Sequence, residues 1–154
     1  MAVIADPTGA TFCVWQPKQH KGIGVKGETN SLCWNELLTN DTEKAIDFYT
    51  KLFGWQTKTD SGGGTPYTEI INGADHIGGI MQIQPQMGPM PPNWGIYIAV
   101  ADCDGTAQKA TSLGGRQYVP PTDIPKVGRF AVLSDPQGAA FNIIKLNLEH
   151  HENK

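Results

Sequence analysis

The sequence predicts an α+β fold built from two βαβββ halves. A strand, a helix and three further strands are expected over residues 32–84, and the same order is expected again over residues 94–146. An offset of 61 residues places Asp41, which opens the first helix, on Asp102, which opens the second. Each half covers one face of its strands with a helix, so joining the two halves is expected to enclose a cleft.

A second repeat links the two ends of the chain. Residues 2–17 read AVIADPTGATFCVWQP and match residues 131–146, which read AVLSDPQGAAFNIIKL. Each copy reads as two apolar strands joined by D-P-x-G, in which Asp opens the turn, Pro presets φ and Gly supplies a positive φ. Residues 1–16 are therefore interpreted as the terminal hairpin of a mostly absent preceding module, and residues 11–15 are expected to add to the edge of a sheet.

Length, charge and cysteine content limit the classes of function. The 154 residues suit one domain, and the net charge of −3 without clustered Lys and Arg argues against nucleic-acid and membrane partners. Cys13, Cys33 and Cys103 are odd in number and form no C-x-x-C pair, which argues against a disulfide framework or a thiolate zinc site and favours a reducing compartment. Because no apolar run approaches ~20 residues and no signal segment is recognisable, a cytoplasmic protein is expected.

Turn residues and apolar periodicity place the individual elements. Residues 17–31 are polar and rich in glycine, as is typical of a linker. The first helix is expected to start at Asn40 or Asp41, with Glu43 as a capping-box partner, and to end at Gly54. The other expected elements are strands at 32–38, 55–59, 67–71, 77–83, 95–100, 116–119, 129–133 and 140–146, a helix from Asp102 or Asp104 to Leu113, a loop at 120–127 and a polar tail at 147–154.

The chain resembles the vicinal oxygen chelate superfamily, which contains glyoxalase I, bleomycin-resistance proteins and extradiol dioxygenases. DTEKAIDFYTKLFGW at 41–55 is similar to the family's first helix, and SDPQGAAF at 134–141 is similar to its terminal hairpin. The resemblance, closest to the second module of a two-module glyoxalase-like protein, implies a U-shaped mixed sheet around an open cleft, with the helices on the outer face. It identifies no reaction, because members include isomerases, ring-cleaving oxygenases, thiol transferases and drug-binding proteins.

The resemblance also implies where a metal would bind. Family enzymes hold one divalent metal through four side chains, typically His, Gln or Glu, on the first and fourth strands of each half. Matching this pattern assigns the four positions to Trp34, Gln82, Gly95 and Asn142. Trp and Gly offer no side-chain ligand and Asn is a weak one, so no metal and no other cofactor is expected, and a divalent metal is kept as an alternative.

Glu36 is the candidate catalytic residue. If Trp34 faces the cleft, strand alternation places Glu36 on the same face. A carboxylate beside an indole in a concave site can acquire a raised pKa and act as a general base. The alternative is a structural carboxylate that accepts hydrogen bonds from the backbone or from Arg129.

Three functions are consistent with these residues. The preferred one is a metal-independent module that binds a small, partly aromatic molecule. The second is a metal-dependent lyase, isomerase or dioxygenase in which Glu36, Gln82 and His76 form a rearranged site. The third is an assembly module of a longer two-module protein, with homodimers formed through residues 2–16. The residues expected to bind the small molecule are Trp34, Gln82, Tyr97 and Asn142.

Overall fold

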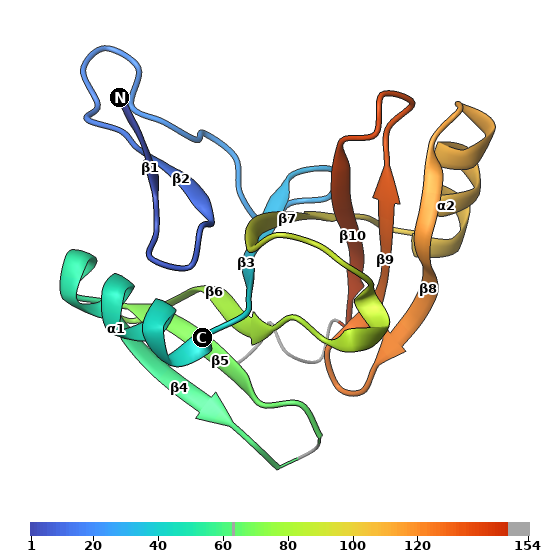
Figure 1. The fold of residues 1–154 in the computed structure, drawn as a ribbon. Coiled ribbons are helices and arrows are strands. Elements are labelled where there is room, and N and C mark those ends of the chain that lie inside the picture. The colour runs from blue at the N-terminus through green and yellow to red at the C-terminus, as the bar shows by residue number, and fades with distance from the viewer. Residues whose placement is uncertain (63, 148–154) are drawn as a thin grey trace. The chain divides into compact units, whose positions relative to one another are not determined.

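In the described part of the chain, two helices and ten strands follow one another in the predicted order, so the α+β class is confirmed (Figure 1). This computed structural model describes residues 1–62 and 64–147. The predicted polar tail at 147–154 lies outside the described residues, except for Asn147. The elements are β1 (Ala2–Ala5), β2 (Thr11–Val14), β3 (Leu32–Thr39), α1 (Thr42–Phe53), β4 (Gln56–Asp60), β5 (Tyr67–Asn72), β6 (Asp75–Gln82), the 3-10 helix η1 (Pro85–Met87), β7 (Asn93–Ala99), α2 (Cys103–Ser112), β8 (Arg116–Ile124), β9 (Gly128–Ser134) and β10 (Ala140–Leu146).

The chain divides into two units. Unit 1 comprises Met1–Gly22 and Trp34–Gly95, and unit 2 comprises Ile23–Cys33 and the chain from Ile96 onward. Residues 17–31 contain neither helix nor strand. No helix in the described part of the chain is long and apolar enough to span a membrane.

Unit 1 contains the first βαβββ half. Its strands lie in the order β4-β5-β6-β3, with β3 parallel to β6 and the other neighbours antiparallel. Alternate residues point to opposite faces of a strand, and one face packs on α1. The core on this side of the sheet consists of Leu37, Ile70 and Ile80 from the strands, with Ala45 and Tyr49 from α1.

The ends of α1 follow from its capping residues. Asp41 is the N-cap, and its carboxylate accepts a hydrogen bond from the Lys44 backbone N–H at 3.0 Å. The predicted capping box with Glu43 was therefore wrong, because it required Asn40 as the cap. Gly54 ends the helix in the left-handed conformation at φ 70°, as predicted.

Unit 2 contains the second half, with strands in the order β7-β10-β9-β8 and α2 packed on one face. Its core includes Ala107 of α2, Leu133 and Ile143, all buried. The loop predicted at 120–127 was wrong for most of its length, because β8 continues to Ile124. Prolines are tolerated there since β8 is an edge strand, and its pairing with β9 shifts register between Val119 and Thr122.

A hairpin forms at residues 2–14, as the D-P-x-G turn predicted. β1 and β2 form a separate two-stranded sheet, and within the described chain β2 pairs with β1 alone. The hairpin packs on α1 instead, with the Phe12 ring 5.4 Å from that of Tyr49, measured between centroids. Residues 11–14 thus extend no other sheet within the described chain, and their pairing with a strand from outside this chain stays a prediction.

Candidate functional site

Three polar side chains form a hydrogen-bonded series on the face of the unit 1 sheet opposite α1. The indole Nε1 of Trp34 donates to the Tyr67 hydroxyl at 2.9 Å, and this hydroxyl donates to Oε2 of Glu36 at 3.0 Å. Trp34 and Glu36 alternate with the buried Leu37 and Thr39, which face the other side of β3. The structure thus brings Trp34 and Glu36 to one face, and it adds Tyr67 between them.

A glycine on β6 makes room for the tyrosine. Gly79 is in register with Glu36 on β3 and with Glu69 on β5, so it lies in one row between two carboxylates. A Cβ at this position would collide with the Tyr67 hydroxyl. The absence of a side chain on Gly79 therefore permits the Tyr67 ring to lie across the strand and to reach both Trp34 and Glu36.

Burial holds the Tyr67 phenol in its neutral form. Desolvation raises the pKa of Tyr67 most, and the neighbouring Glu36 charge raises it further, while the hydrogen bond from Trp34 acts in the opposite direction. The pKa of Tyr67 consequently lies well above its ordinary range. The phenol remains a hydrogen-bond donor to Glu36 throughout the neutral and mildly alkaline pH range.

This raised pKa predicts a loss of stability at high pH. The unfolded chain releases the Tyr67 proton near pH ~10, whereas the folded chain retains it to higher pH. Between these two values the folded state binds more protons, so the free energy of unfolding falls as the pH rises. Denaturant titrations at increasing pH should show this fall, and Tyr67→Phe should reduce its slope. An equally steep fall in the Tyr67→Phe variant would contradict the assignment.

Gln82 lies on the opposite face of the sheet from Trp34 and Glu36. It is in register with the fully buried Thr39, and its amide Nε2 donates to the Asn40 carbonyl at 2.8 Å. It lines a cavity of about 600 Å³ together with residues of α1, β4 and β5. The prediction that Gln82 joins Trp34 and Glu36 in one site was wrong. Gly79 pairs with Glu36 and shares its face, and Gln82 lies three residues further along β6, so its side chain points to the opposite face.

Tyr97 and Asn142 come together within unit 2. They are in register on the parallel strands β7 and β10, on the face away from α2, because the next pair, Ile98 and Ile143, faces the α2 core. Tyr97 is only 8% exposed, and Asn142 Nδ2 donates to the Ile96 carbonyl at 3.1 Å. Of the predicted site residues, Trp34 and Glu36 thus share a face in unit 1, and Tyr97 and Asn142 share a face in unit 2. The cleft shared by both units stays a prediction.

Arg129 has partners other than the one considered from the sequence. Its guanidinium donates to both carboxylate oxygens of Asp104, at 2.7 and 2.9 Å, and to Asp123 at 3.1 Å. These bonds join α2 to β8 and β9, and they hold the pKa of Asp104 below its ordinary value. Glu36 accepts a hydrogen bond from Tyr67, and a bond from Arg129 to Glu36 stays a prediction.

Comparison with known proteins shows the family to which this chain belongs. The family model of the Glyoxalase/Bleomycin resistance protein/Dioxygenase superfamily matches residues 31–143. The chain belongs to this superfamily. The resemblance inferred from the first helix and the terminal hairpin is thereby confirmed.

Curated relatives of this glyoxalase-superfamily chain are longer than the chain itself. CFP32 of Mycobacterium tuberculosis, which bears a glyoxylase name, is 44% identical over 146 residues, which cover 94% of this chain and 55% of CFP32. The anthracycline biosynthesis protein DnrV of Streptomyces peucetius is 37% identical over 150 residues, covering 95% of this chain and 52% of DnrV. The chain thus spans about half the length of these relatives.

A solved structure supports the fold alone. Methylmalonyl-CoA epimerase from Mycobacterium tuberculosis superposes with a TM-score of 0.55 at 15% sequence identity, over 77% of this chain and 89% of the epimerase. At this level of identity the likeness shows a common fold and carries no information about the reaction.

The superfamily's metal does not fit the corresponding residues of unit 1. The Trp34 indole nitrogen carries a hydrogen and donates it to Tyr67, so it has no lone pair for a metal. His76, considered for a rearranged metal site, lies with its Nδ1 2.8 Å from Glu69 Oε2. Within residues 1–62 and 64–147, no three His, Cys, Asp or Glu side chains gather in a cluster able to hold a metal ion.

Tyr67 and Gly79 are the two site residues that sequence reasoning missed. The signal was the pair Gly78-Gly79 inside a predicted strand, because glycine in a strand often marks the close approach of another group. Gly79 admits the Tyr67 side chain, and a Cβ on Gly78 would lie 2.7 Å from the Asn35 carbonyl oxygen. The glycines indicated close approach, and only the strand register shows which groups approach.

Proposed function

We propose that this glyoxalase-superfamily domain binds a small, partly aromatic molecule on the unit 1 face formed by Trp34, Glu36 and Tyr67, without the superfamily's usual metal. The observation that carries the proposal is the hydrogen-bonded series from the Trp34 indole through the Tyr67 hydroxyl to the Glu36 carboxylate. Side chains fixed in this way are preorganised, which reduces the entropy cost of binding.

Each member of the series supports a different part of recognition. An indole offers an extended apolar surface on which an aromatic ring can stack. A carboxylate has about four acceptor positions, so Glu36 can accept from a ligand hydroxyl or amine in addition to its bond from Tyr67. Tyr97 and Asn142 place a phenol and an amide on one face of unit 2, and their part in binding remains a prediction.

The ligand class is suggested by a relative. DnrV is named for anthracycline biosynthesis, and anthracyclines combine a planar, hydroxylated aromatic system with polar substituents. The planar ring system of such a molecule can stack on the Trp34 indole, and its hydroxyl groups can donate to the Glu36 carboxylate. Doxorubicin is therefore a suitable probe of this chemistry.

Trp34→Ala is expected to weaken doxorubicin binding about tenfold, because loss of one stacked aromatic contact costs ~1 kcal/mol or slightly more. Isothermal titration calorimetry on the full chain measures this change. Trp15→Ala is the matched control, since Trp15 is 55% exposed beside the hairpin and lies outside the series. Equal affinities for the two variants, or no saturable binding by the unsubstituted chain, would refute the proposal.

Elemental analysis separates this proposal from a metal-dependent enzyme. Protein purified without a His tag is expected to contain no stoichiometric Ni, Zn, Mn or Fe. A stoichiometric metal that is lost in Glu36→Ala would replace the proposed function with a metal-dependent lyase, isomerase or dioxygenase.

A further inference from the structure

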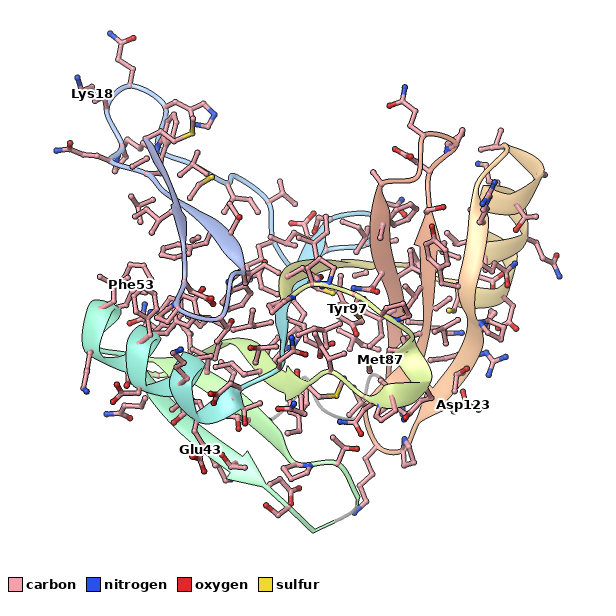
Figure 2. All side chains as sticks on the ribbon, in the orientation of Figure 1. Lys18, Glu43, Phe53, Met87, Tyr97 and Asp123 are labelled. Carbon is pink, nitrogen blue, oxygen red and sulfur yellow. The ribbon has the colours of Figure 1, made fainter. Side chains whose placement is uncertain are left out.

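The hairpin at residues 2–14 has an aromatic contact surface on α1. The Phe12 ring meets three rings of the helix edge-on, with centroid distances of 6.1 Å to Phe48, 5.4 Å to Tyr49 and 6.0 Å to Phe53. Figure 1 shows β1 and β2 beside α1, and Figure 2 labels Phe53 at the end of that helix. Ala10, which follows the hairpin turn, is completely buried. The hairpin thus packs with the geometry of a core rather than of a loose terminus.

A polar contact at the hairpin turn complements the aromatic surface. Asp6 is 5% exposed, and its Oδ2 accepts from the Tyr49 hydroxyl at 2.9 Å. The same hydroxyl accepts from Trp94 Nε1 at 2.8 Å. The second carboxylate oxygen of Asp6 accepts the backbone N–H groups of residues 8, 9 and 10. The buried carboxylate is therefore fully engaged by the turn and by α1.

The two helices differ where the hairpin binds. At the 61-residue offset, Phe48 and Tyr49 of α1 correspond to Lys109 and Ala110 of α2. Helix α1 thus carries large aromatic groups toward the hairpin, whereas α2 has a charged and a small residue at these positions. This difference is expected if α1 buries two faces, one against its sheet and one against the hairpin, whereas α2 buries only the face on its sheet.

We propose that the outer face of α1 is a docking interface for the terminal D-P-x-G hairpin of a glyoxalase-type module, occupied by residues 2–14 of the same chain. The assignment of the hairpin to such a module rests on its match with β9 and β10, which form the terminal hairpin of unit 2. In unit 2, β10 also pairs with β7 and β9 also pairs with β8. The corresponding edges of β2 and β1 pair with no further strand within the described chain.

The relatives are consistent with a module joined in tandem through this interface. This chain covers 55% of CFP32 and 52% of DnrV, so each relative has room for a second unit of similar size. On the hairpin side that faces away from Phe12, Val3 is 63% exposed, and Trp15, just beyond β2, is 55% exposed. A module that ends in this hairpin would cover Val3 and Trp15 with its own strands, while Phe12 on the opposite side of the hairpin stays packed on α1.

Hydrogen exchange of the full chain, followed by mass spectrometry, tests the interface. In Phe48→Lys, which gives α1 the residue found in α2, backbone amides of residues 2–14 are expected to exchange at least about tenfold faster. Leu113→Lys, a similar change at an exposed position of the other half, should leave their exchange unchanged. Tyr49→Phe retains the ring and removes the hydroxyl that donates to Asp6 and accepts from Trp94. It should also accelerate exchange in the hairpin, while β3, β4, β5 and β6 stay protected.

Two results would overturn the proposal. The first is hairpin exchange that is equally fast in the unsubstituted chain, Phe48→Lys and Tyr49→Phe, because α1 would then provide no protection. The second is protection that increases with protein concentration, because the hairpin on α1 would then come from a second copy of the chain.

Discussion

Asp6→Ala is expected to lower the free energy of unfolding by about 3 kcal/mol. The substitution removes the acceptor for the backbone N–H groups of the hairpin turn and for the Tyr49 hydroxyl. These donors lie in a buried environment, and a buried donor left without a partner costs ~1–3 kcal/mol. Urea denaturation, followed by both circular dichroism and tryptophan fluorescence, measures the change.

The second D-P-x-G turn provides an internal control for this experiment. Asp135 accepts the backbone N–H groups of Gln137 and Ala139 in the same way, although its turn lies at the surface. Asp135→Ala is therefore expected to cost only about 1 kcal/mol, the usual value for a lost side-chain cap. Equal costs for the two substitutions would show that Asp6 acts within its turn alone and contributes nothing at α1.

Gly79→Ala is expected to disrupt the Trp34–Tyr67–Glu36 series. The added methyl group would occupy the position of the Tyr67 hydroxyl, so the ring must rotate away and release its hydrogen bonds. Overpacking of this kind costs ~1–3 kcal/mol, and we expect about 2 kcal/mol of lost stability. Doxorubicin affinity should fall about tenfold as well, because Glu36 and Trp34 lose the group that orients them.

A double-mutant cycle isolates the cause of this loss. If the collision with Tyr67 is responsible, Gly79→Ala should cost much less in a Tyr67→Ala background. Gly24→Ala controls for the general effect of replacing glycine, because Gly24 has open space around its Cβ position and no positive φ. An equal cost of Gly79→Ala with and without the Tyr67 ring would contradict the proposed role of Gly79.

Features set by nearby residues were predictable from the sequence. The cap at Asp41, the left-handed Gly54 and both D-P-x-G turns depend on contacts within a few residues, and each appears where it was expected. The αβ order of both halves followed from apolar periodicity in the same way. Trp34 and Glu36 share a face because alternation along one strand needs no knowledge of its neighbours.

Features set by neighbouring strands or by packing were not predictable in this way. The face of Gln82 depends on the pairing of β6 with β3, and a change of one residue in register reverses it. Tyr67 enters the site from β5, which no local pattern connects with Glu36. The docking of Phe12 on α1 likewise depends on a tertiary contact, whereas the unpaired strand edges suggested pairing with another sheet.

The contact between Tyr67 and Gly79 also constrains how related sequences can diverge. A lineage that acquires a side chain at position 79 must either move the aromatic ring at position 67 out of this position or replace it, since both cannot occupy the same volume. The two positions are therefore expected to change together across relatives. Chains that retain Tyr and Gly at these positions are expected to keep the Trp34–Tyr67–Glu36 series, even where their overall identity is low.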